Sequence, residues 1–254
     1  MTNSVVQYNY SHGNAGAGYG LFQFGYASAM GNNVIRYNIS EADGAGISGW
    51  GQGPRFDTSD GSPGTVDDAK DSLFYNNTIV NPNGPATHFF GSLTDLGIYN
   101  NTFLVANGNK PVYLEDWGEF YLHDMEFLNN VYWSSDEAFI IDWEGMVFDR
   151  LEDWANTTGQ EMIGPDLVGL AVDPELTGPF SGGTPLDDPE QLETLAAYRL
   201  QTTSLLIDAG LNVADLDLPI SLGLTNVGQR DFFGNPIPSP SDGDYDIGAH
   251  EFEK

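Results

Sequence analysis

The sequence predicts an all-β fold: a single-stranded right-handed parallel β-helix with three strands per coil and an irregular C-terminal cap that contains a short helix. The first observation is a recurring phrase in which β-branched and aromatic residues surround one or two Asn. It is clearest at residues 73–79, 97–103 and 126–132, and looser copies stand at 5–11 and 34–40. Repeats at intervals of roughly 20–50 residues are typical of solenoids. Each copy therefore indicates a strand, a sharp bend and a second strand.

The second observation is the position of the Asn at the bend. Asn9, Asn38, Asn77, Asn101 and Asn130 follow one another at steps of 29, 39, 24 and 29 residues. Asn tolerates the left-handed backbone conformation, and its amide can hydrogen-bond to the same position of the next coil. We therefore expect these five residues to stack in one row, with right-handed connections between parallel strands.

The third observation is the composition, which favours one elongated domain with many turns. The chain has 254 residues, enough to bury a sizeable core, and it contains 31 Gly and 14 Pro. It has no Cys, so a disulfide frame and a thiolate metal site are both excluded. No run of 18 apolar residues is present, so the sequence predicts no membrane span.

The charge balance excludes several partners. The chain carries 37 acidic and 8 basic residues, for a net charge of −29. Nucleic acid and anionic lipid are repelled by such a field, so we expect neither as a partner. A saline habitat explains the excess of carboxylates through surface hydration. Scattered carboxylates can bind Ca²⁺, but no motif specifies a metal site and the expected chemistry requires no cofactor.

The repeat divides the chain into two parts. Residues 1–144 are predicted to form the coils, and residues 145–254 the final coils and the C-terminal cap. The short helix is expected at 187–200, where acidic residues come first and Arg199 comes late, as the helix dipole favours. The N-terminus lacks the pattern of a signal peptide. Because the open end of a solenoid exposes unpaired strands, we expect the chain to be the C-terminal part of a longer protein.

The third strand of each coil is expected to carry the functional residues. These strands are predicted at 18–24, 45–50, 86–90, 111–115 and 138–143. Alternation directs Phe22, Leu114 and Ile141 inward. It directs a polar and aromatic ladder outward, which consists of Gln23, Trp50, His88, Glu115 and Asp142. An inserted loop at 51–70, which carries Arg55, is expected to form one wall of a groove beside this ladder.

Motifs at both ends of the chain support a family resemblance. The Asn-Asn-Thr repeats, the Asp-Phe-Phe-Gly-Asn-Pro segment at 231–236 and the ending at 246–251 are the residues that carry it. With them the chain resembles the right-handed parallel β-helix repeat proteins of the pectate-lyase-like superfamily, of the secreted bacterial carbohydrate-active type. The resemblance implies the fold over nearly the whole chain and an extracellular or cell-surface location. It does not select one activity, because the superfamily contains lyases, hydrolases, epimerases and adhesive modules.

Glycoside hydrolysis is the activity that we expect from the residues. It needs two carboxyls, about 5–5.5 Å apart for retention or 6.5–9.5 Å for inversion. Glu115 and Asp142, on adjacent coils, are expected near the shorter spacing. Two further catalytic candidates are Asp43 and Asp116. The expected contacts to a polysaccharide or oligosaccharide come from Trp50, Tyr113, His12, His88, Gln23, Arg55 and Glu144.

Two alternatives stay open. A lyase that acts on a uronic-acid polymer needs cations near the substrate carboxylate, and Arg55 and Lys110 are the candidates, within a field that repels acidic substrate. A non-catalytic module that binds glycan or a surface needs no catalytic pair. Ordinary structural roles are also open, because Asp43 suits a turn, His12 suits a loop brace, and Glu115 and Asp116 suit a solvated edge. The sequence specifies neither the sugar nor the oligomeric state.

Overall fold

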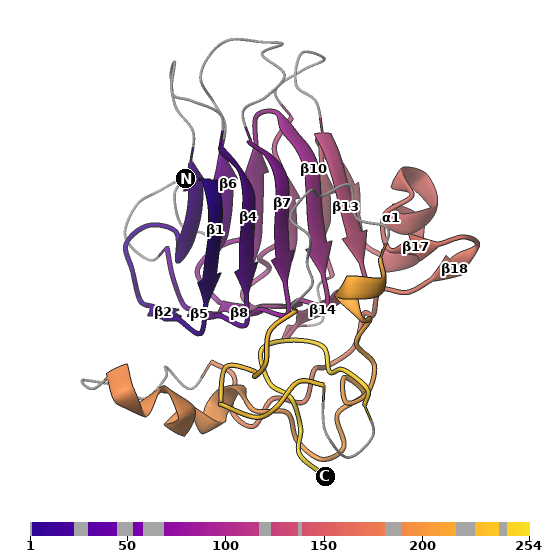
Figure 1. The fold of residues 1–254 in the computed structure, drawn as a ribbon. Coiled ribbons are helices and arrows are strands. Elements are labelled where there is room, and N and C mark those ends of the chain that lie inside the picture. The colour runs from indigo at the N-terminus through magenta and orange to yellow at the C-terminus, as the bar shows by residue number, and fades with distance from the viewer. Residues whose placement is uncertain are drawn as a thin grey trace.

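The computed structural model describes residues 2–22, 30–44, 53–57, 69–116, 123–136, 139–180, 189–216, 227–238 and 243–254. Its strands form three stacked sheets around a common core, which is the architecture of a parallel β-helix (Figure 1). Within the sheets all neighbours pair in parallel except at one edge, where β15 and β16 are antiparallel. The predicted fold class is confirmed.

Five coils each contribute one strand to each sheet. Sheet A consists of β1 (Thr2–Gln7), β4 (Met30–Arg36), β7 (Ala69–Tyr75), β10 (Leu93–Tyr99) and β13 (His123–Leu128). Sheet B consists of β2 (Tyr10–His12), β5 (Ile39–Glu41), β8 (Thr78–Asn81), β11 (Thr102–Val105) and β14 (Val131–Ser134). Sheet C consists of β3 (Tyr19–Phe22), β6 (Pro54–Asp57), β9 (Thr87–Phe90), β12 (Val112–Leu114), β15 (Ile141–Trp143) and β16 (Met146–Phe148).

The bend between sheets A and B holds the predicted row of asparagines. The side-chain amide of each donates to the Oδ1 of the next, over 2.9 Å from Asn9 to Asn38 and over 3.0 Å at each later step to Asn130. The preceding residue takes the left-handed conformation, with φ between 49° and 60° at Tyr8, Tyr37, Asn76, Asn100 and Asn129. We assigned two roles to Asn, the left-handed conformation and the hydrogen bond between coils. In the structure two successive residues of the bend carry them: the first is left-handed, and the second, Asn, makes the hydrogen bond.

Alternation directs apolar side chains into the space between the sheets. Phe56 stacks on Phe89 with ring centroids 4.9 Å apart, and Phe89 meets Phe127 edge to face. Leu114 and Ile141 are fully buried, as predicted. The prediction for Phe22 is wrong: Leu21 is buried and Phe22 is 37% exposed. Gly18 and Gly20 have no side chain, so the alternation of apolar and polar residues did not indicate which residues of this strand point into the core.

Segments after β15 close one end of the solenoid. Helix α1 (Leu151–Thr158) carries Glu152 and Asp153 in its first turn, and its C-cap residue is Gly159, whose φ is 78°. Its buried face carries Leu151 and Trp154. The short strands β17 (Met162–Ile163) and β18 (Asp166–Leu167) follow as an antiparallel pair. Helix α1 was not predicted from the sequence.

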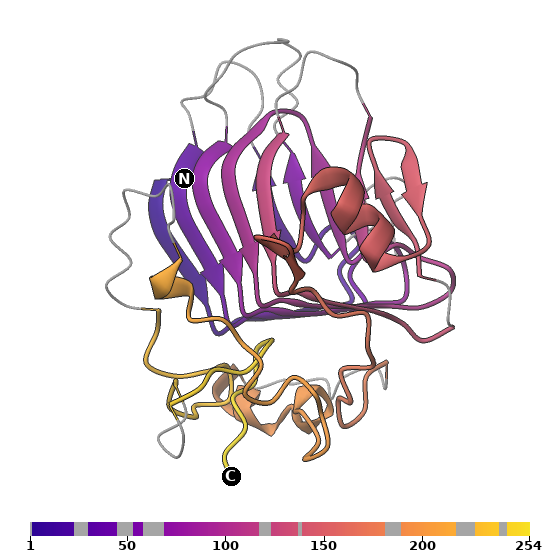
Figure 2. The same ribbon diagram turned by 90° about the vertical axis from the view of Figure 1, so that its right-hand side faces the viewer.

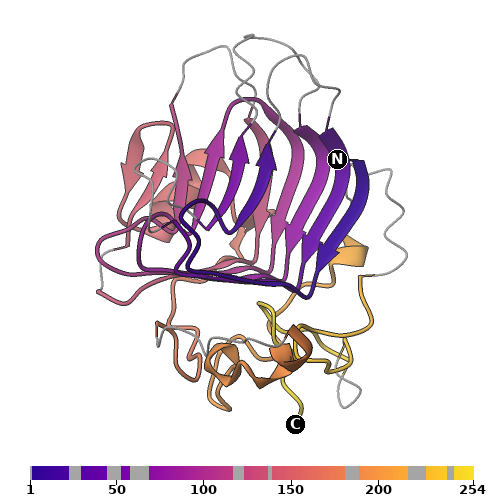
Figure 3. The same cartoon turned by 90° about the vertical axis from the view of Figure 1, so that its left-hand side faces the viewer.

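The remaining C-terminal segments cover the outer face of sheet B (Figures 1, 2 and 3). The predicted helix at 187–200 is instead two 3-10 turns, η1 (Pro189–Thr194) and η2 (Ala196–Tyr198), within the described residues from 189 on. Their apolar side chains pack against sheet B as expected, in one cluster of Leu195, Tyr198, Leu200, Val80 and Leu104. A third turn, η3 (Val213–Asp215), packs instead against sheet A, where Val213 clusters with Val34 and Leu73. None of the described helices is long and apolar enough to span a membrane.

Candidate functional site

The outer face of sheet C carries two rows of mainly polar side chains. The strand register aligns Arg55 with His88, His88 with Tyr113, and Tyr113 with Asp142. Two residues further along the strands, a second row contains Asp57, Phe90, Glu115 and Glu144. Parallel pairing continues to this row, since the backbone amide of Glu144 donates to Leu114 over 2.9 Å. Of the predicted outward ladder, His88, Glu115 and Asp142 therefore lie together on the outer face of sheet C.

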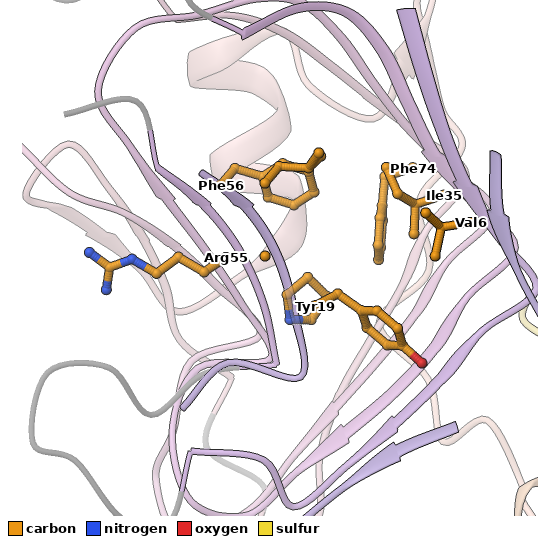
Figure 4. Close-up of a pocket in the computed structure, with 9 residues that line it drawn as sticks. Val6, Tyr19, Ile35, Arg55, Phe56 and Phe74 are labelled. Carbon is orange, nitrogen blue, oxygen red and sulfur yellow. The ribbon is translucent and has the colours of Figure 1, made fainter. Parts of the chain in front are cut away.

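Arg55 lies on β6, and not in a loop that walls the sheet. The third strand of the second coil is Pro54–Asp57, so our placement of this strand at 45–50 is wrong. Pro donates no backbone hydrogen bond, so within sheets it is confined to positions such as the first residue of a strand. In the sequence we interpreted Pro54 as part of a loop. Arg55 extends away from the core while Phe56 points into it (Figure 4). Gln23 and Trp50 lie outside the described residues.

Four side chains on this face form a continuous hydrogen-bonded chain, which we call the sheet C network: Asp57, Arg55, His88 and Glu115. Arg55 binds Asp57 Oδ2 through Nε at 3.0 Å and Nη2 at 2.8 Å, and its Nη1 lies 3.3 Å from His88 Nδ1. His88 Nε2 lies 3.0 Å from Glu115 Oε2. A guanidinium only donates, so Nδ1 accepts and Nε2 carries the proton that His88 donates to Glu115.

The surroundings of His88 keep its ring neutral. Burial, and after it the Arg55 guanidinium, lower the pKa of His88 to about 4, although Glu115 and Asp57 oppose the shift. His88 is 3% exposed, and its ring stacks on Tyr113 with centroids 4.6 Å apart. A neutral, fixed imidazole is a positioning group for Glu115: it orients the carboxylate without adding a second positive charge.

Tyr113 and Lys110 join the network to Asp142. The Lys110 ammonium lies 4.3 Å from the centroid of the Tyr113 ring and 2.5 Å from Asp142 Oδ2. Burial raises the pKa of Tyr113, and the carboxylates of Glu115 and Asp142 raise it further. The other oxygen, Asp142 Oδ1, is buried and has no hydrogen-bond partner among the described residues. The half-exposed ring and the two carboxylates thus share one patch of the sheet.

The register corrects the spacing that we expected between the two acids. Asp142 pairs with Tyr113, and Glu115 stands two residues beyond Tyr113. One strand spacing combined with a two-residue rise gives a backbone separation of about 8 Å between Glu115 and Asp142. Glu144, rather than Asp142, is the neighbour of Glu115 at the shorter spacing. The backbone separation of about 8 Å therefore places the two acids further apart than directly paired neighbours, and it leaves room for the wider carboxyl spacing of inverting hydrolases.

The structure places the other predicted residues apart from the network or at its border. Asp116 and Glu144 are exposed at the ends of β12 and β15, and Glu144 has a φ of 52°. Asp43 is fully buried and accepts hydrogen bonds from Asn14 and from Ser40, so it braces the first two coils.

His12 lies on sheet B and not on sheet C. It is exposed, and its ring stacks on that of Tyr10 with centroids 4.6 Å apart. Asp57, which completes the network, was not predicted to lie on the face of sheet C. The signal was present in the alternation of polar, apolar and polar residues at Arg55, Phe56 and Asp57.

No three His, Asp or Glu side chains among the described residues converge as metal ligands, so we assign no metal-binding residue. No protein-family model matches the chain, and no curated protein matches it. The chemistry of the outer face of sheet C is therefore the basis for a function.

Proposed function

We propose that the protein is an extracellular or cell-surface glycoside hydrolase that binds a neutral or weakly charged polysaccharide on the outer face of sheet C. Sheet B is covered by the C-terminal segments, whereas Tyr113, Lys110 and Glu115 on sheet C keep partly exposed side chains. An aromatic ring flanked by hydrogen-bonding groups suits a sugar ring, because it offers an apolar surface beside polar partners. The net charge of −29 favours a substrate without negative charge.

One observation carries the proposal: a carboxylate held as an acceptor by a neutral histidine, with a second acid on the adjacent coil of the same face at a backbone separation of about 8 Å. Glu115 is the general base, which takes a proton from water as the water oxygen attacks the anomeric carbon. Asp142 is the general acid, which gives its proton to the leaving oxygen as the glycosidic bond breaks. This division produces inversion of configuration.

The Lys110 ammonium sets a condition on the reaction. It contacts Asp142 Oδ2 in the free protein. The leaving oxygen of a substrate can reach this carboxyl oxygen only when the substrate displaces the ammonium.

Binding without cleavage is the second candidate, and the same contact favours it. Lys110 and His88 both donate to the carboxylates, an arrangement that also suits a rigid surface for sugar hydroxyls. A uronic-acid lyase has less support, because Arg55 and Lys110 are already engaged by Asp57 and Asp142.

Incubation with a panel of neutral polysaccharides, followed by assays of reducing ends and of ultraviolet absorbance, separates these candidates. We expect new reducing ends without an unsaturated product. Glu115→Gln and Asp142→Asn should each lower turnover at least 100-fold. The control Asp153→Asn, on an exposed turn of α1, should leave turnover unchanged.

Three results contradict the proposal of hydrolysis. Full turnover in Glu115→Gln and Asp142→Asn rejects the catalytic assignment. Saturable glycan binding with no product supports the binding module, provided that Tyr113→Ala weakens it. An absorbing product identifies a lyase.

A further inference from the structure

A cavity of about 210 Å³ lies between β14, the last strand of sheet B, and the start of helix α1. Its lining comes from four parts of the chain: residues 132–134 of β14, Phe139, residues 149–152 and Ala171. The site proposed on sheet C uses none of these residues. Since a water molecule occupies about 30 Å³ in the liquid, the cavity is large enough for a small organic ligand.

Only the first part of the edge of β14 that faces away from β11 is paired. Leu170 lies beside it as an isolated parallel bridge to Val131. The amide of Leu170 donates to the Asn130 carbonyl over 2.9 Å, and its carbonyl accepts from the Tyr132 amide over 2.8 Å. The next residue, Ala171, is exposed and lines the cavity. Beyond the Tyr132 amide, the edge of β14 therefore borders the cavity.

This part of the edge carries two backbone groups without a partner among the described residues, the Tyr132 carbonyl and the Ser134 amide. The amides of Val131 and Ser135 donate to β11. Because successive residues of a strand direct their backbone groups to opposite edges, Tyr132 and Ser134 face the cavity side. The side chain of Tyr132 points into the core and that of Trp133 packs on the outer face of sheet B, so the strand edge itself lines the cavity. It favours a ligand that offers a donor and an acceptor side by side.

Apolar side chains form one wall of the cavity, and charged side chains lie at its rim. Phe139 is partly buried against the core, and Leu151 is buried. Asp149, Arg150 and Glu152 are exposed. Arg150 and Glu152 form an ion pair over 3.4 Å, with side chains that are 63% and 53% exposed, so they can turn toward a ligand and offer it donors and acceptors. An apolar wall beside hydrogen-bonding groups suits a sugar ring.

The chemistry of the cavity favours a neutral sugar over an anion or a peptide. A hydroxyl both donates and accepts, so two neighbouring hydroxyls of a sugar ring can bond the Tyr132 carbonyl and the Ser134 amide together. The net charge of −29, with two carboxylates at the rim, disfavours an anion. An extended peptide pairs along several residues of a free edge, but here Leu170 closes the edge on one side and a turn begins at Ser135 on the other.

We propose that this cavity binds one unit of a neutral sugar, whose neighbouring hydroxyls bond the Tyr132 carbonyl and the Ser134 amide while its apolar face lies against Phe139 and Leu151. The site is a second position for glycan, separate from sheet C, and it requires no hydrolysis there. A polysaccharide held in this cavity stays attached to the protein while the sheet C network remains accessible to another part of it.

Fluorescence titration tests this site, because Trp133 lines the cavity. The probes are glucose, galactose, mannose and xylose, and every protein carries Tyr113→Ala, so that the ring on sheet C does not contribute. We expect saturable binding of at least one of these sugars. Ser134→Pro removes the amide donor at an unpaired edge position, where proline is tolerated, and should weaken binding at least tenfold. The matched control, Ser134→Ala, keeps the amide and should bind as tightly as the parent.

Ala171→Trp tests the cavity without a change in β14, and it decides the question if the proline variant fails to fold. Ala171 is exposed and lines the cavity, so the larger side chain should fill it and abolish binding. The assay measures binding alone, so a failure of hydrolysis on sheet C would leave its result unchanged. Three results would each overturn the proposal: no saturable binding of any of the four sugars, undiminished binding in Ala171→Trp, or tighter binding of an acetylated alanine tripeptide amide than of the sugars.

Discussion

The two ends of the described solenoid differ in what lies against their last strands. At the C-terminal end the chain returns and covers every sheet, and Glu161 takes the place of the next asparagine. Its Oε1 accepts from the Asn130 amide at 2.7 Å and from the Tyr132 hydroxyl at 2.6 Å. At the N-terminal end β1, β2 and β3 keep their outer edges, and Asn9 begins the row. Each amide of the row donates toward the C-terminal end, so the last amide needs an acceptor there, and Glu161 supplies it.

The largest expected effect is the contrast between a central and a terminal asparagine. Asn101→Ala removes an amide that donates to Phe74 and Asn130 and an oxygen that accepts from Asn77. Several buried polar groups lose their partners, so unfolding in urea should show a loss of about 4 kcal/mol. Asn9→Ala should cost only about 0.5 kcal/mol, since Asn9 is exposed. Equal losses would show that the two ends do not differ in this respect.

The closing carboxyl gives the next effect, which depends on pH. Burial raises the pKa of Glu161 to about 7 from 4.5, although Tyr132 and Asn130 oppose the shift. The folded state then holds a proton that the unfolded state releases first, so this group loses stability as pH rises from about 4.5 to 7. Integrated over that window, the loss is about 3 kcal/mol.

Glu161→Gln isolates this effect from all other titrating groups. The variant and the parent chain should have similar stability near pH 4.5, and the variant should be more stable near pH 8 by up to about 3 kcal/mol. Urea midpoints across this range measure the difference. Parallel pH profiles of the two proteins would exclude Glu161 as the titrating group.

The smallest effect compares two glycines in the left-handed conformation. Gly159 after α1 has a φ of 78°, Gly13 in the first coil has a φ of 60°, and an added Cβ at either would meet no atom within 4 Å. Each Gly→Ala change therefore adds about 1 kcal/mol of local strain. Global unfolding should register the full cost for Gly159 but less than half for Gly13, because each strand of the first coil pairs with only one described strand, and such a coil can unfold locally first. A larger loss at Gly13 would indicate that the first coil is as cooperative as the closed end.

The stacked coils were predictable because their signal is periodic and local. Asn38, Asn77, Asn101 and Asn130 follow strands whose alternation marks an inner face, and the structure places all four in one row. The helix α1 was missed because its N-cap residue, Arg150, makes no side-chain capping bond, so the usual start signal is lacking.

The candidate site was only partly predictable, because it depends on register between coils of unequal length. His88, Glu115 and Asp142 belong to strands that follow the repeat closely, and their outward direction was visible from alternation. Arg55 and Asp57 follow a long connection and a proline, so no local pattern tied them to sheet C. The network that joins Asp57 to Glu115 exists only once the coils are stacked.

The asparagine row makes the height of the stack independent of how much chain each coil contains. Successive members are 29, 39, 24 and 29 residues apart, and Glu161 follows after 31, yet every step spans one strand spacing. The differences in length fall in the connections between the strands. Evolution or design can therefore lengthen, shorten or exchange those connections coil by coil, and alter what the surface recognises, while the spine that supports them keeps its geometry.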